Sequence, residues 1–198
     1  EECCDVKFRE NKTVSGGEVP SENLPPLEAV VVPNNTIVDF DIYLPGCPPT
    51  SKLILTAVTA LLEGKPIELE PHTVCHYCAR EKKETPVEKI LRPYEGIADP
   101  DRCLLEQGYI CVGSATWGLC EGQCVNMGAT CRGCYGPPPP IFQDQGANAM
   151  SMMGTYAPLT PEEIKEQVKD PLGLFNRFTY TTSHLGSIRI KREEAKNK

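Results

Sequence analysis

Eight cysteines fall between positions 75 and 134, and no other feature of the sequence limits its possible folds so strongly. The whole chain of 198 residues has 11 cysteines, 19 prolines and 16 glycines, but only one tryptophan and five phenylalanines. A core this thin does not offset the conformational entropy lost on folding, so we expect metals, disulfides or partner subunits to supply the rest. The eight clustered cysteines are Cys75, Cys78, Cys103, Cys111, Cys120, Cys124, Cys131 and Cys134.

The spacing of these cysteines favours iron–sulfur clusters over the two alternatives, disulfides and structural zinc. The odd total and the lack of a secretory signal disfavour a disulfide framework. Two C-x2-C pairs, Cys75/Cys78 and Cys131/Cys134, bracket the group, but the four interior cysteines are single and scattered. Zinc sites usually join two close pairs, whereas a cubane accepts ligands from several loops. We therefore predict two 4Fe-4S clusters, with a structural zinc-binding adaptor as the less favoured alternative.

Other candidate residues are given simpler interpretations. His72 and His76 are not needed as ligands where four cysteines per cluster are present, and Trp117 is interpreted as packing over a cluster. Cys3 and Cys4 are adjacent, which makes them poor joint ligands of one cube, so we interpret them as free thiols. The sequence contains no nucleophile elbow, P-loop or dinucleotide fingerprint, and no catalytic residue is predicted in this chain.

Charge and hydropathy narrow the class of protein. The net charge of −7 does not favour nucleic-acid binding, because an acidic surface repels phosphates. No run of 18 or more apolar residues is present, so no membrane span is predicted. No signal peptide is recognised either, and the expected location is cytoplasmic.

Residues 37–70 have the pattern of a strand, a turn and a helix. Apolar and polar residues alternate from Val38 to Leu44, which predicts a half-buried strand, and Pro45–Gly46 ends it. Apolar residues recur at helical spacing over 49–63, with Thr50 or Ser51 as the cap and Gly64 at the end.

The remaining segments complete the predicted organisation. Residues 1–36 are expected to be extended, and 71–158 to form a loop-rich, mostly irregular and α-helical iron–sulfur cluster domain. Thr160-Pro-Glu-Glu163 is a strong helix start, so 159–198 is predicted to be a C-terminal helix followed by a charged tail. The predicted fold class is an α/β strand-turn-helix remnant followed by that cluster domain.

Several motifs in fixed order, between about Ser21 and Arg177, resemble one known family. They are Leu44-Pro-Gly-Cys-Pro-Pro49, Leu61-Leu-Glu-Gly64, Cys103-Leu-Leu-Glu-Gln-Gly108, Cys131-Arg-Gly-Cys-Tyr-Gly136, Asp144-Gln-Gly-Ala147 and Asp170-Pro-Leu-Gly-Leu-Phe-Asn-Arg177. The chain resembles the small subunit of nickel–iron hydrogenases, above all the cytoplasmic methanogen-type enzymes linked to heterodisulfide reductase or to deazaflavin reduction.

The resemblance implies an assignment for each cysteine of the group. Small subunits of this family carry proximal, medial and distal clusters in a line from the nickel–iron site of the large subunit. The implied distal ligands are Cys75, Cys78, Cys103 and Cys111, and the implied medial ligands are Cys120, Cys124, Cys131 and Cys134. Cys47 matches one proximal ligand. Its companions belong to an N-terminal flavodoxin-like half that this sequence lacks, so a third cluster would need ligands from another chain.

The resemblance also implies a function and partners. We expect an electron-transfer subunit of a nickel–iron hydrogenase, which relays electrons between the large-subunit nickel–iron site and a downstream iron–sulfur or flavin subunit. Such a downstream subunit would be a component of heterodisulfide reductase or of a deazaflavin reductase. The alternative is an accessory iron–sulfur relay of another oxidoreductase without hydrogenase activity.

Overall fold

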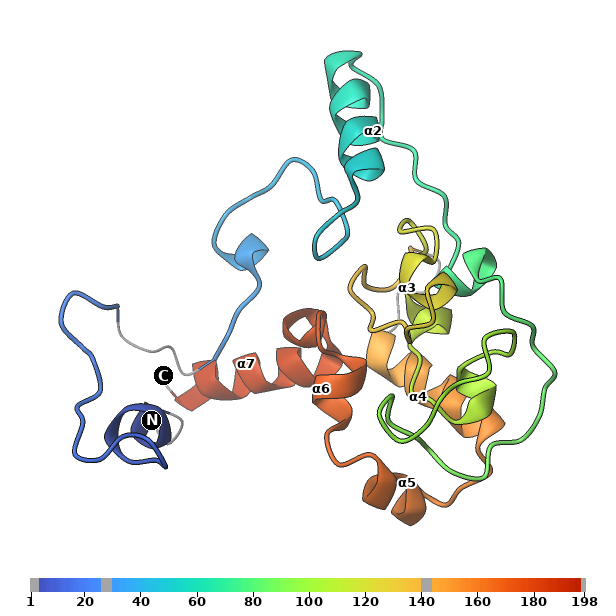
Figure 1. Ribbon diagram of the computed structural model, residues 1–198. Coiled ribbons are helices and arrows are strands. Elements are labelled where there is room, and N and C mark those ends of the chain that lie inside the picture. The colour runs from blue at the N-terminus through green and yellow to red at the C-terminus, as the bar shows by residue number, and fades with distance from the viewer. Residues whose placement is uncertain (1–3, 26–29, 140–143, 197–198) are drawn as a thin grey trace.

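Short helices joined by long loops make up the chain, which a computed structural model describes over residues 4–25, 30–139 and 144–196 (Figure 1). The α-helices are α2 (Ser51–Leu62), α3 (Gln123–Asn126), α4 (Gln145–Tyr156), α5 (Pro161–Gln167), α6 (Pro171–Phe175) and α7 (His184–Lys196). A π-helical turn, η1 (Asp5–Arg9), and 3-10 turns η2 (Asn34–Thr36), η3 (Val74–Tyr77), η4 (Leu105–Gln107), η5 (Gly113–Ala115) and η6 (Tyr180–Thr182) accompany them.

The segment 38–44 does not form the strand that its alternation predicts. A strand needs a neighbour to pair with its backbone groups, and no backbone hydrogen bond of residues 39–44 is found within the described part of the chain. Phe40, Ile42 and Tyr43 therefore keep exposed side chains. The α/β interpretation of 37–70 stays a prediction that depends on another polypeptide segment to complete the sheet.

Helix α2 stands apart from the rest of the molecule in Figure 1. Thr50 caps it by accepting a hydrogen bond from the Leu53 amide, at 3.3 Å. Only Leu53 and Ala57 are buried on this helix, while Leu55 and Leu62 are 68% and 84% exposed. Most of its apolar surface thus faces away from the described residues.

The main apolar core surrounds α4, which contacts η4, η5 and α6. Asp144 begins this helix, because its carboxylate accepts the backbone amides of Gly146 and Ala147. The buried core residues are Ile90, Leu105, Ile110, Val112, Ala115, Ala149, Met153, Val168 and Phe175. The turns η4 and η5, which adjoin Cys103 and Cys111, are therefore packed directly on the core.

The C-terminal part is more helical than its sequence suggested. Helix α5 has the predicted capping box, in which Thr160 and Glu163 exchange hydrogen bonds. The charged residues from 189 onward were expected to be a tail, but 184–196 form α7. Ser183 accepts the Gly186 amide at 3.1 Å, and lysine, arginine and glutamate are good helix formers. No helix within the described ranges is long and apolar enough to cross a membrane.

Candidate metal-cluster site

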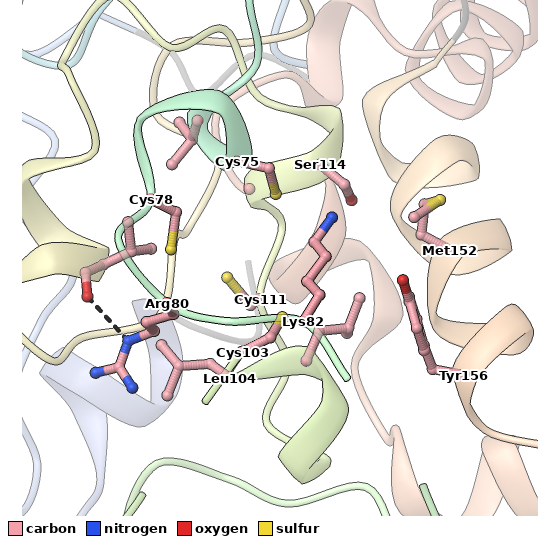
Figure 2. A pocket seen from close by; sticks show the side chains of 14 residues that line it. Cys75, Cys78, Arg80, Lys82, Cys103, Leu104, Cys111, Ser114, Met152 and Tyr156 are labelled. Carbon is pink, nitrogen blue, oxygen red and sulfur yellow. Dashed lines mark hydrogen bonds between the residues drawn. The ribbon is translucent and has the colours of Figure 1, made fainter. Parts of the chain in front are cut away.

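Four of the eight clustered cysteines line one pocket. Cys75 lies on η3, Cys78 directly follows it, Cys103 precedes η4 and Cys111 precedes η5. Figure 2 shows their sulfur atoms turned toward a common space. Apolar side chains complete the wall, among them Val74, Leu104, Val125 and Met152. The structure thus brings together the four residues that the family resemblance implied as one ligand set.

The glycine at position 113 keeps that space open. A Cβ on Gly113 would lie 3.5 Å from the Cys75 sulfur and 3.6 Å from the Cys111 sulfur. Its backbone amide donates a hydrogen bond to the Cys111 thiol. Amides directed at sulfur stabilise negative charge, which is a property that cluster ligands require.

Burial dominates the electrostatics of these thiols. It raises the pKa of Cys75 to about 12, and the ammonium of Lys82 acts in the opposite direction. Burial also raises the pKa of Cys111, against the hydrogen bonds from the Gly113 and Cys131 amides. Because iron binds thiolates, an iron–sulfur cluster held here would displace protons from buried thiols.

Two cationic side chains border the pocket, and they differ in the hydrogen bonds that hold them. Arg80 is fixed by bonds to three carbonyls, from its Nε to Val125 at 3.2 Å and from its Nη1 to Asp99 at 2.6 Å and Arg102 at 3.1 Å. Lys82 instead extends into the space between Cys75 and Ser114 (Figure 2). Sequence reasoning missed Lys82, because a lysine in a charged run such as 81–84 usually faces solvent.

The other four cysteines form a second group beside the first. Burial raises the pKa of Cys134, and the nearby charges of Cys120 and Cys124 raise it further. Burial likewise raises the pKa of Cys131 to about 12, and the next contribution is the charge of Cys111. Cys120 and Cys124 are therefore within electrostatic range of Cys134, and Cys131 is within range of both Cys111 and Cys120.

A direct contact joins the two groups. The Cys131 amide donates to the Cys111 sulfur at 3.4 Å, and the Val112 amide donates to the Cys131 carbonyl at 3.0 Å. Val74 and Val125 form a small core with Cys131, against which Cys78 and Cys111 pack. The two predicted ligand sets are thus adjacent across a short, largely apolar boundary.

A buried glutamine, which the sequence analysis did not single out, supports the second group. Gln145 is fully buried and its Nε2 donates to the Gly133 carbonyl and the Thr116 hydroxyl, both at 3.1 Å. Its Oε1 accepts from the Thr179 hydroxyl at 3.1 Å. Gly133 has φ of +85° and a Cβ there would come within 3.0 Å of this amide. The only sequence signal was its place in the Asp144-Gln-Gly-Ala147 motif.

Cys47 lies next to the second group and outside it. Its side chain is exposed, and its backbone amide donates to the Cys134 thiol. The neighbouring Tyr135 hydroxyl accepts the Thr50 amide at 2.8 Å, which fixes the Cys47 loop on the cluster domain. Lys52 of α2 forms an ion pair with Glu121 nearby. The Cys47 thiol is thus exposed at the surface, beside Cys134.

The remaining candidates do not line the pocket of Figure 2. His72 and His76 stack on each other with ring centroids 4.0 Å apart, and the Trp117 indole donates to the Glu70 carbonyl at 2.7 Å. Cys4 is half-buried, and Cys3 lies outside the described residues. In the described ranges no three His, Cys, Asp or Glu side chains are close enough to bind a single metal ion. A cubane differs in that each thiolate binds a separate iron.

Comparisons with known proteins decide the family. No protein-family model matches the sequence. A subunit of the F420-non-reducing hydrogenase (vhu) of Methanocaldococcus jannaschii is 40% identical over 179 residues, which are 90% of this chain and 60% of that protein. A relative in Archaeoglobus profundus, 32% identical over 80% of this chain and 51% of its own length, is named an iron–sulfur subunit of F420-non-reducing hydrogenase. This chain belongs to the family of F420-non-reducing hydrogenase iron–sulfur subunits.

These names confirm the predicted resemblance to a methanogen-type hydrogenase iron–sulfur subunit. The chain spans about 60% of the length of the Methanocaldococcus and Methanothermobacter marburgensis relatives. A shorter match, to a subunit of the F420-non-reducing hydrogenase of Methanothermus fervidus, is 37% identical over 113 residues. These residues are 52% of this chain and 87% of that protein.

Proposed function

We propose that residues 71–158 hold two 4Fe-4S clusters and relay electrons within a nickel–iron hydrogenase complex. The observation that carries the proposal is the pocket in which Cys75, Cys78, Cys103 and Cys111 converge from separate loops. The second cluster would be held by Cys120, Cys124, Cys131 and Cys134. When bound, such clusters accept and donate single electrons.

The residues of the pocket fit this cofactor. Four thiols supply a complete ligand set, and Gly113 leaves the space between two of them free. The Gly113 and Cys131 amides donate to the Cys111 sulfur, while Lys82 places a positive charge near Cys75. The apolar wall around the sulfurs lowers the local dielectric constant and strengthens the amide–sulfur hydrogen bonds, whereas the exposed Lys82 charge is screened by solvent. The chain's own contribution is therefore to fix the ligands and to adjust the charge around them.

The order of the cysteine groups supports a relay. Cys47 adjoins Cys134 on one side, and Cys131 contacts Cys111 on the other. We propose that a third cluster, for which Cys47 would be one ligand, obtains its remaining ligands from another chain. Electrons would then pass between the nickel–iron site of a large subunit and a heterodisulfide reductase or deazaflavin reductase component, in the cytoplasm.

Hydrogen gas provides the direct test of this function. The complex would be purified anaerobically through a tag on this chain and exposed to hydrogen, with electron paramagnetic resonance to detect reduced clusters. We expect nickel in the complex and two reduced-cluster signals from this chain. A complex without nickel, whose clusters are reduced by dithionite and not by hydrogen, would instead indicate an accessory relay of another oxidoreductase.

A further inference from the structure

Three arginines surround a second cavity, which Cys131 also lines. The cavity has a volume of about 130 Å³, and Arg92, Arg132 and Arg177 all border it. They are distant in sequence, and each comes from a different segment of the fold. Three positive side chains at one cavity are unexpected in a chain whose net charge is −7.

Contacts of the backbone and side chains hold these three segments in place. The Leu91 amide, next to Arg92, donates to the Gly108 carbonyl at 2.7 Å. Arg132 follows Cys131, whose carbonyl accepts the Val112 amide at 3.0 Å. Arg177 donates from Nε to the Gly173 carbonyl at 2.9 Å, which leaves its two terminal nitrogens to point elsewhere.

The floor of the cavity is apolar. Ile110, Val112 and Leu174 contribute to it, and the first two belong to the main core. An apolar floor beneath guanidinium groups lowers the local dielectric constant and strengthens charge-assisted hydrogen bonds. Arg132 and Arg177 are exposed and Arg92 is half-buried, so an anion can reach all three and reduce the repulsion between their charges.

One carboxylate of the described chain lies near these arginines: Glu95 accepts the Arg92 backbone amide at 2.6 Å and interacts with the Arg92 charge, without forming an ion pair with its guanidinium. None of the ion pairs found in the described part of the chain includes Arg92, Arg132 or Arg177. Guanidinium groups match the geometry of carboxylate and phosphate oxygens, with which they form paired hydrogen bonds. The unused donors therefore match an oxyanion from outside the described residues.

We propose that this cavity is an oxyanion-binding site, which takes a carboxylate or phosphate group between Arg92, Arg132 and Arg177. The anion comes either from solution or from an acidic side chain of a partner subunit. In the second case the three arginines hold that subunit beside Cys131. That consequence rests on the proposed function of Cys131, whereas anion binding itself does not.

Inorganic phosphate tests whether the anion comes from solution. Its binding to the anaerobically purified complex would be measured by calorimetry in low-salt buffer, for the natural sequence and for the double variant Arg132→Gln/Arg177→Gln. The control is Lys12→Gln/Lys83→Gln, which removes two exposed positive charges elsewhere. We expect one phosphate per chain, bound at least about tenfold more weakly by the arginine variant and unchanged in the control, because charge-assisted hydrogen bonds are lost.

Dissociation of the complex at increasing salt concentration tests whether the anion is an acidic side chain of a partner subunit. If a partner's carboxylate fills the cavity, phosphate does not bind the complex, and the arginine variant separates from its partner subunits at a lower salt concentration than the control does. Iron content and helix content equal to those of the natural sequence would exclude misfolding as the cause. The site is overturned if the arginine variant changes neither phosphate binding nor the salt concentration of dissociation. Neither measurement depends on electron relay, so failure here and failure of the relay proposal are distinguishable.

Discussion

The cluster domain, 71–158, and the preceding segment, 37–70, use apolar residues in opposite ways. In the domain Val74, Val112 and Val125 are at most 2% exposed and pack around the cysteines, whereas in the segment Leu55 and Leu62 are largely exposed. Large apolar faces on soluble proteins usually mark contacts with other protein. The difference teaches that 71–158 buries apolar residues around its predicted ligand sets, while 37–70 leaves much of its apolar surface uncovered by the described residues.

Loss of one predicted cluster ligand should have the largest of the four effects, and this effect should be confined to 71–158. We expect Cys111→Ser to remove one of two clusters, or about four of eight iron atoms per chain, because the buried hydroxyl is a poor iron ligand. Iron and sulfide analysis of the purified complex measures this. Cys4→Ser is the control, since Cys4 lies in the N-terminal region. Equal iron loss in both variants would contradict the assignment.

A buried contact that supports the domain should have the next largest effect. Gln145→Ala removes three hydrogen bonds of a buried side chain, to the Gly133 carbonyl and to the Thr116 and Thr179 hydroxyls, which costs about 1–3 kcal/mol in unfolding free energy. We expect the variant to lose half of its iron at a lower urea concentration than the natural sequence does. The visible absorbance of the clusters at increasing urea concentration measures this midpoint. Gln123→Ala removes an exposed glutamine and should leave that midpoint in place. A shared midpoint for both variants and the natural sequence would show that Gln145 gives no support to the Cys131–Cys134 loop.

A substitution on α2 should change subunit association and leave the iron content of 71–158 unchanged. We expect Leu62→Lys to leave iron content unchanged, because this side chain touches little of the described protein. Association with the remaining hydrogenase subunits should weaken at least about tenfold, since burying a leucine contributes about 1.5–3 kcal/mol. Quantitative pull-down at several chain concentrations measures the effect, with Glu63→Gln as a control on the adjacent residue. Loss of iron with unchanged association would contradict the role given to α2 in contacts with other subunits.

The charge of Lys82 should have the smallest effect. A positive charge near Cys75 favours the reduced form of a cluster there, so Lys82→Gln should lower its midpoint potential. The shift is small because Lys82 is itself exposed and screened by solvent. A redox titration followed by electron paramagnetic resonance detects it, and Lys83→Gln should leave the potential unchanged. An upward shift, or equal shifts in both variants, would refute the role given to Lys82.

Local patterns predicted the ends of helices better than they predicted the strand. The caps at Thr50 and Thr160 are contacts within one turn, so nearby residues decide them. The strand over 38–44 depends on a distant pairing partner, which alternation alone does not supply. In the same way, the grouping of Cys75 with Cys111 came from family motifs, because spacing does not reveal which loops converge.

Side chains outside the motifs were the hardest to assign from sequence. Lys82 lies within a charged run, and only the pocket shows that it extends toward Cys75. Gln145 contacts residues 12 to 34 positions away, and such contacts have no periodic signal. The three arginines around the second cavity are equally dispersed.

Metal analysis of the anaerobically purified complex tests the central claim most directly. Iron, acid-labile sulfide, zinc and nickel would be counted per copy of this chain after subtraction of the clusters in its partners. Two thiolate-held cubanes predict about eight iron and eight sulfide on this chain, without stoichiometric zinc. Zinc bound at the eight cysteines, with no sulfide, would contradict the electron relay and establish a structural metal site in its place.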